Sequence, residues 1–151
     1  MQTDIKRNEA TKNRPEGDRP LDAPYLFIDV PDFVRQLQQE KAWETSDRNG
    51  ITIFKSDGIT MVVTIVKAGG LIKDNQVDEY LTIHVLKGKA RVLTTNGDIE
   101  LSDHQMVTFH PFIVHSLEAV TDVIFLLSTY SYCPTNDTIV EKTETELDIT
   151  D

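Results

Sequence analysis

Short segments in which apolar and polar residues alternate run through the chain from residue 50 to residue 130. Alternation of this kind puts successive side chains on opposite faces of a strand. We predict strands at 51–55, 59–67, 80–86, 90–95, 99–101, 105–109, 114–119 and 123–130. Gly58 and Gly97 each follow an Asp or Asn, which is a tight hairpin signal. Because no helical segments separate these strands, the sequence predicts an all-β antiparallel sandwich or barrel.

The first 24 residues are polar and are interrupted by Pro15, Gly17, Pro20 and Pro24. They show neither a helical nor a strand period, so we expect an extended or flexible arm. An alternative is that residues 14–24 pack across the barrel or onto a second subunit. Residues 25–28 are a compact apolar run and are expected to be the first buried segment.

One short helix is predicted over residues 31–42. Pro31 suits a first helical position, because the amide hydrogen that proline lacks would have no partner there. Asp32 complements the helix dipole in the first turn. Phe33, Val34 and Leu37 form an apolar stripe, so we expect a helix that acts as a lid or brace on one end of the barrel.

Length and charge exclude several classes of protein. A chain of 151 residues indicates one domain, here a barrel at 25–132 between the arm (1–24) and an acidic tail (133–151). The formal net charge of −10 argues against binding to nucleic acid. No apolar run approaches the roughly 18 residues of a membrane span, and the first residues lack an apolar leader. The lone Cys133 cannot form an internal disulfide, so we expect a cytoplasmic protein.

Two segments, 69–88 and 104–119, carry a more specific pattern. In the first, Gly69 and Gly88 stand at a characteristic distance, and the segment closes with the run L-T-I-H-V-L-K-G. In the second, Pro111 is followed four residues later by His115, and then by Ser and Leu. This pattern resembles the two signature segments of the cupin family. The resemblance implies a cupin-type antiparallel β-barrel (a double-stranded β-helix or jelly roll) that forms a homodimer.

The resemblance also shows which metal ligands are missing. The family's two histidines and glutamate of the first segment correspond here to Asn75, Val77 and Leu81, and the second segment keeps His115. A catalytic metal requires three or four ligands from His, Asp, Glu or Cys. We therefore expect no metal and no cofactor. Anchoring the pattern on Gly70 instead would bring in Gln76 and Asp78, and Asp78 and Glu79 could reach inward from a loop.

The histidines are distinguished by the side of the strand on which they lie. If Leu81 faces inward, so do Ile83 and Val85, and His84 faces outward. A slip of one residue would reverse this and put His84 inside. His104 is expected on the surface, and His110 in a structural hydrogen bond. His115 is the main functional candidate, with a buried structural role as the alternative.

The predicted function is a barrel that binds a small, partly apolar molecule without a metal. The predicted binding residues are His115, Asn75, Val77, Leu81 and Phe109. We assign no catalytic residue, because the sequence contains no recognisable catalytic motif. One alternative is a metal-dependent enzyme of the dioxygenase or isomerase type that uses His115 with non-standard ligands. Another is a structural or regulatory dimerising module. Neither a nucleic acid nor a membrane is expected as a partner.

Overall fold

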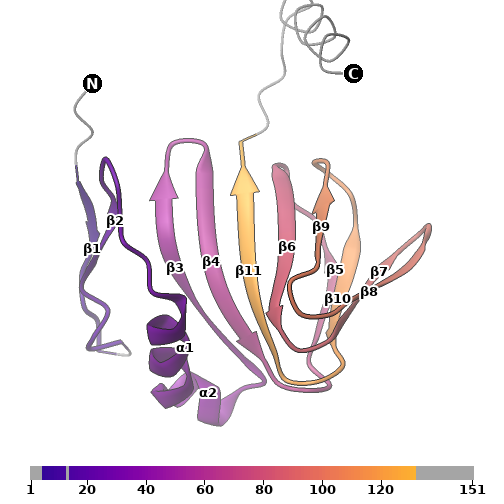
Figure 1. Ribbon diagram of the computed structural model, residues 1–151, viewed down its shortest axis with the longest axis horizontal. Helices are drawn as coiled ribbons and strands as arrows, with labels where there is room; N and C mark the ends of the chain where they lie inside the picture. The colour runs from indigo at the N-terminus through magenta and orange to yellow at the C-terminus, as the bar shows by residue number, and fades with distance from the viewer. Residues whose placement is uncertain (1–4, 13, 132–151) are drawn as a thin grey trace, which may run out of the picture.

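The computed structural model describes residues 5–12 and 14–131 (Figure 1). The acidic tail and Cys133 lie outside the described residues. The helices are α1 (Val30–Gln39) and α2 (Lys41–Thr45). The strands are β1 (Lys6–Asn8), β2 (Arg19–Asp22), β3 (Arg48–Ser56), β4 (Ile59–Val66), β5 (Leu71–Asn75), β6 (Tyr80–Lys87), β7 (Ala90–Thr94), β8 (Gly97–Leu101), β9 (Met106–Phe109), β10 (His115–Ala119) and β11 (Val123–Tyr130).

Two antiparallel sheets form the barrel (Figure 1). One sheet has the order β3-β4-β11-β6-β9, and the other has the order β5-β10-β7-β8. The all-β antiparallel barrel predicted from the alternating segments is confirmed. Each predicted strand has a counterpart, but β1 and β2 in the arm were not expected, and neither was β5. Most of its side chains are exposed, and it lies at the edge of its sheet, so its sequence shows little apolar alternation.

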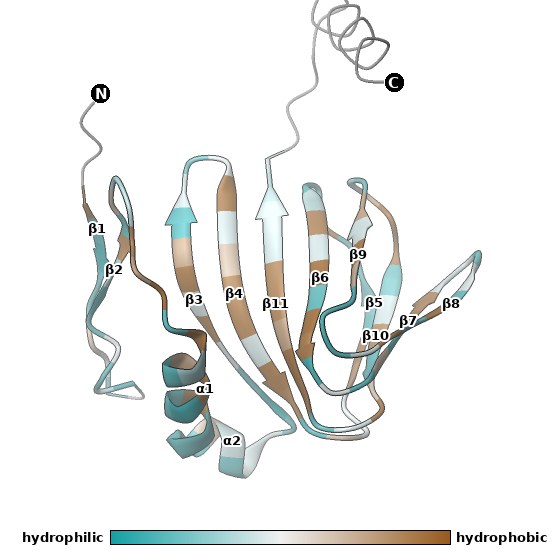
Figure 2. Cartoon of the chain, in the orientation of Figure 1, coloured by the Kyte–Doolittle hydropathy of each residue, from teal (hydrophilic) through white to brown (hydrophobic). Residues whose placement is uncertain are grey.

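The interior of the barrel is filled by apolar side chains from both sheets. Along β6, the residues Leu81, Ile83 and Val85 are buried while their neighbours are partly exposed. They belong to one cluster with Val66, Ala90, Val92, Leu101, Phe109, Leu117, Ala119, Val123 and Phe125. The banding of the strands in Figure 2 follows the same alternation. The predicted inward facing of these β6 residues is confirmed.

Helix α1 packs on the outside of the five-stranded sheet. Asp29 caps its first turn by accepting a hydrogen bond from the backbone N–H of Asp32 at 3.2 Å. Val34 and Leu37 are buried in a second cluster that includes Ile51, Ile53, Val63 and Ile65 of β3 and β4. The expected single helix over 31–42 is thus two helices, and α1 braces a sheet face instead of one end. Neither helix in the described chain is long and apolar enough to cross a membrane.

The arm forms a hairpin, β1 with β2, beside strand β3 (Figure 1). Arg19 donates to the backbone carbonyl of Thr52 from Nε at 3.0 Å and from a terminal nitrogen at 2.6 Å. Arg14 donates to the carbonyl of Gly50 at 2.9 Å. Both acceptors belong to β3, so two arginines attach the arm to the edge of the barrel in its own chain.

Gly69 and Gly88 stand at the two ends of segment 69–88, and they differ in their surroundings. Gly69 has φ +88 and Gly88 has φ +107, a region that residues with a Cβ rarely adopt. A Cβ at Gly69 would meet nothing within 4 Å, whereas at Gly88 it would lie 2.3 Å from the carbonyl of Asp122. Gly88 is therefore required both by its φ and by close backbone approach.

Candidate functional site

A cavity of about 220 Å³ lies between the two sheets. It is lined by Thr60, Val62, Ile72, Asn75, Val77, Leu81, Ile83, His115, Leu117, Leu127 and Thr129. Four of the five residues expected from the sequence are thus brought around one space. The fifth, Phe109, stacks on His115 with ring centroids 4.8 Å apart and ring planes at 10°. It supports the imidazole from behind and does not line the cavity.

Strand register arranges the lining residues in two rows. In the first row, Asn75 pairs with His115 on one sheet. Thr60, Thr129 and Leu81 are successive partners on the other sheet. In the second row, Ile72 pairs with Leu117, and Val62, Leu127 and Ile83 are partners opposite. The first row carries four polar side chains, those of Asn75, His115, Thr60 and Thr129, and the second is entirely apolar.

The polar row lies toward one end of the barrel, which we call the entrance. It is close to the β3–β4 turn, the start of β6 and the end of β11, which lie together at the upper edge in Figure 1. In the other direction the apolar row continues into the packed cluster that contains Val85, Val92 and Phe125. A ligand therefore meets polar groups at the entrance and apolar groups at the floor.

His115 is the first residue of β10 and is only 3% exposed. Its Nδ1 lies 3.1 Å from the backbone carbonyl oxygen of Ile113. A carbonyl oxygen accepts and cannot donate, so Nδ1 carries the hydrogen. In the neutral ring, Nε2 is then the acceptor. His115 is thus buried and hydrogen-bonded, as the structural alternative for this residue requires, and its second ring nitrogen stays available.

Two loops next to the cavity are joined by hydrogen bonds. The backbone N–H of Phe112 donates to the carbonyl of Val77 at 2.8 Å. The side-chain amide of Gln76 donates to the carbonyl of Phe112, also at 2.8 Å. These bonds connect the loop that precedes His115 to the loop that carries Val77. Val77 and His115 both line the cavity, and the joined loops hold these two residues in position without a ligand.

Known structures share this barrel. A cupin-2 domain containing protein from Shewanella frigidimarina matches with a TM-score of 0.57 and 12% identity, over 69% of this chain and 94% of that chain. A cupin superfamily protein from Desulfitobacterium hafniense matches with a TM-score of 0.54 and 13% identity, over 56% of this chain and 78% of that chain. This chain has the cupin fold.

A conserved protein of unknown function from Streptococcus pyogenes also matches, with a TM-score of 0.59 and 15% identity, over 76% of this chain and 94% of that chain. No protein-family model matches the sequence, and no curated protein is significantly similar to it. At these identities the likeness establishes the fold, so the function of this cupin barrel must be argued from its own residues.

The donor set of the cupin barrel does not fit a divalent metal. His115 is the one imidazole that lines the cavity, and its lining includes no carboxylate or thiolate from the described residues. Within residues 5–12 and 14–131, no group of three His, Cys, Asp or Glu side chains could hold a metal ion. Gln76, Asp78 and Glu79, the alternative ligands from the sequence, do not line the cavity.

The remaining histidines lie elsewhere. His84 is on the outer face of β6, between Leu126 and Met106 in the strand register. Its predicted outward facing is confirmed. His104 is exposed with φ +68 in the turn before β9. His110 is exposed, and its ring lies 5.2 Å from that of Tyr80 in an edge-on contact.

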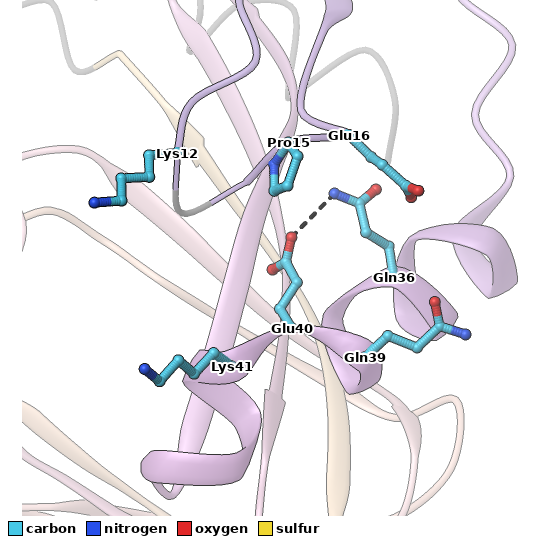
Figure 3. A pocket seen from close by; sticks show the side chains of 7 residues that line it. All are labelled: Lys12, Pro15, Glu16, Gln36, Gln39, Glu40 and Lys41. Carbon is cyan, nitrogen blue, oxygen red and sulfur yellow. Dashed lines mark hydrogen bonds between the residues drawn. The ribbon is translucent and has the colours of Figure 1, made fainter.

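A larger hollow, of about 400 Å³, lies between the arm and α1 (Figure 3). Its central group, Glu40, accepts two hydrogen bonds from Arg14 at 2.9 Å, one from Asn49 at 3.0 Å and one from Gln36 at 3.2 Å. Burial by itself raises the pKa of Glu40, but these bonds hold the pKa below its ordinary value. Because its carboxylate is already saturated, we interpret this hollow as a structural joint between arm and helix.

Proposed function

We propose that this chain is a small-molecule-binding cupin barrel whose site is the cavity between Asn75, His115 and the apolar floor. The observation that carries the proposal is the two-row lining, with polar side chains at the entrance and apolar side chains below. Small-ligand sites usually combine a mostly apolar wall with a few polar groups that orient the ligand.

The size of the cavity limits the ligand. Its volume of about 220 Å³ lies below the roughly 300–1,000 Å³ of typical ligand pockets. An apolar cavity of about 150 Å³ holds a benzene molecule in an unrelated protein. A ligand built on one ring or a short branched chain therefore suits this site, whereas a nucleotide or an oligosaccharide exceeds it.

Metal-free binding is part of the proposal, and it is supported by the single imidazole in the lining. The metal-dependent enzyme considered from the sequence loses support for the same reason, because one strong ligand does not hold a divalent ion. General acid–base catalysis by His115 would need a second ionisable group at the reacting atom. The described lining supplies threonines and an asparagine instead. The homodimer and the cytoplasmic location stay predictions.

A fragment screen followed by thermal unfolding tests the proposal. We expect single-ring fragments to raise the melting temperature of the intact chain, and the rise to fall in His115→Ala and Asn75→Ala. His84→Ala is the matched control, because His84 lies on the outer face of the same barrel. Hits that are unaffected by both cavity substitutions would contradict the assigned site. Elemental analysis tests whether binding is metal-free. A content of about one metal ion per chain that disappears in His115→Ala would contradict metal-free binding.

A further inference from the structure

We infer that the ligand of this cavity is an uncharged molecule that donates a hydrogen bond to Nε2 of His115 while its apolar part fills the floor. This inference rests on the proposed function and adds the chemical class of the ligand. It makes His115 the residue that determines specificity.

The polarity of His115 follows from its backbone contact. The carbonyl oxygen of Ile113 holds the hydrogen on Nδ1, at a separation of 3.1 Å. Phe109, stacked at 4.8 Å, fixes the plane of the ring. A 180° flip would keep this plane but lose the hydrogen bond to Ile113, so the ring presents Nε2, the acceptor of its neutral form, to its surroundings. A hydroxyl, amine or amide N–H complements this acceptor, whereas an ether or ketone oxygen does not.

Nε2 of His115 has no hydrogen-bond partner among the described residues, since the hydrogen bond of this side chain is made by Nδ1. Within the same residues, no fully buried side-chain nitrogen or oxygen lacks a partner. Nε2 must therefore touch open space. His115 also borders a second hollow beside Asp74 and Thr94. Its side chain is buried and faces the barrel interior as that of Leu117 does, so we assign the space at Nε2 to the cavity between the sheets. An unpaired acceptor in such a site favours a ligand that supplies the missing donor.

The charge of the ligand follows from the rest of the lining. No lysine, arginine, aspartate or glutamate of the described chain lines the cavity. A charged ligand would lose its hydration without gaining an ion pair, which is costly in an apolar site. Anions are opposed further by Asp78 and Glu79 in the neighbouring loop and by the net charge of −10. An uncharged ligand avoids both costs.

The two rows place such a ligand. Its apolar part lies among Ile83, Leu117 and Leu127, and its donor group lies at the level of His115. Opposite His115, the hydroxyls of Thr60 and Thr129 supply further hydrogen-bonding capacity across the entrance. Phenol has this combination of one apolar ring and one donor, and toluene has the ring without the donor. These two molecules therefore make a matched pair of probes.

The experiment measures the dissociation constants of phenol, toluene and benzoate for the intact chain and for His115→Phe by titration calorimetry. We expect phenol to bind in preference to toluene, and this preference to fall about tenfold in His115→Phe, which corresponds to one hydrogen bond of about 1.4 kcal/mol. In wild type, phenol should also shift the Nε2 resonance of His115 in nitrogen-15 NMR spectra, and toluene should not. The NMR measurement keeps the inference testable if His115→Phe fails to fold.

The outcomes separate the inference from the proposed function. If toluene and phenol both bind and the preference is the same in His115→Phe, the binding cavity stands and the donor inference is wrong. An unshifted Nε2 resonance in phenol-saturated protein leads to the same conclusion. If benzoate binds more tightly than phenol, the uncharged class is wrong. If none of the three probes binds at millimolar concentration, the proposed binding function is contradicted as well.

Discussion

His115 and Asn75 are direct cross-strand partners, because β10 and β5 pair antiparallel with these two residues opposite each other. The two residues are 40 positions apart in the sequence. This pairing was not expected, because β5, the strand that carries Asn75, was not predicted. Their pairing places an amide side chain beside the imidazole at the entrance of the cavity.

The threonines at the entrance should contribute to binding and little to folding. We expect Thr60→Val and Thr129→Val to weaken phenol binding two- to tenfold, because each removes a hydroxyl from the polar row but keeps the shape of the side chain. Calorimetric titration measures the effect. Thr82→Val on the outer face of β6 is the control. Equal affinities for all three variants and wild type would show that the threonines do not touch the ligand.

A smaller side chain on the floor of the cavity should enlarge the cavity and lower the stability of the protein. Ile83 is 1% exposed, so Ile83→Ala should lower the free energy of unfolding by about 2–5 kcal/mol. The same substitution should increase affinity for larger rings relative to phenol. Ile99→Ala is the control, because Ile99 is 39% exposed on β8. Denaturant unfolding measures the first effect, and a similar loss in both variants would contradict the assigned burial.

The two glycines of the 69–88 segment should respond differently to alanine. Gly69→Ala should cost about 1–2 kcal/mol through its positive φ. Gly88→Ala should cost more, because its Cβ would also meet the carbonyl of Asp122 at 2.3 Å. Denaturant unfolding of the two variants measures the difference. Equal losses of unfolding free energy in the two variants would mean that the backbone at Asp122 moves aside without destabilising the protein.

The joint around Glu40 should stabilise the protein at neutral pH and not in acid. Because the pKa of Glu40 is lowered in the folded state, its contribution is present above the unfolded value of about 4.3 and is lost as pH falls through the folded value. We expect Glu40→Gln to cost about 1–3 kcal/mol at pH 7.

The loss of stability in Glu40→Gln should then shrink below about pH 4. Thermal unfolding of wild type and variant across this pH range measures the change, and Glu44→Gln on α2 is an exposed control. A loss in Glu40→Gln that is independent of pH would contradict an ionised Glu40 as the cause.

Part of the site was predictable from spacing. The resemblance to the cupin segments, anchored on Gly69 and Gly88, pointed to Asn75, Val77 and Leu81, and the second segment pointed to His115. All four line one cavity. Alternation along β6 explains the inward facing of Leu81, whereas Asn75 ends β5 and Val77 lies in the loop that follows, so only the resemblance to the family pointed to these two. Thr60 and Thr129 carried no such signal, because a threonine in a strand is ordinary.

The sequence by itself determined the class of fold and favoured the inward face of β6, and its resemblance to the cupin family indicated the loss of that family's metal ligands. Local alternation and residue identity are sufficient for these conclusions. The tertiary structure alone decided that β11 lies between β4 and β6, which brings Thr60 and Thr129 opposite His115. It also decided that Arg14 reaches Glu40 and holds the arm to α1. These contacts join residues far apart in the chain, and pairing at such distances is set by the packing of the whole barrel.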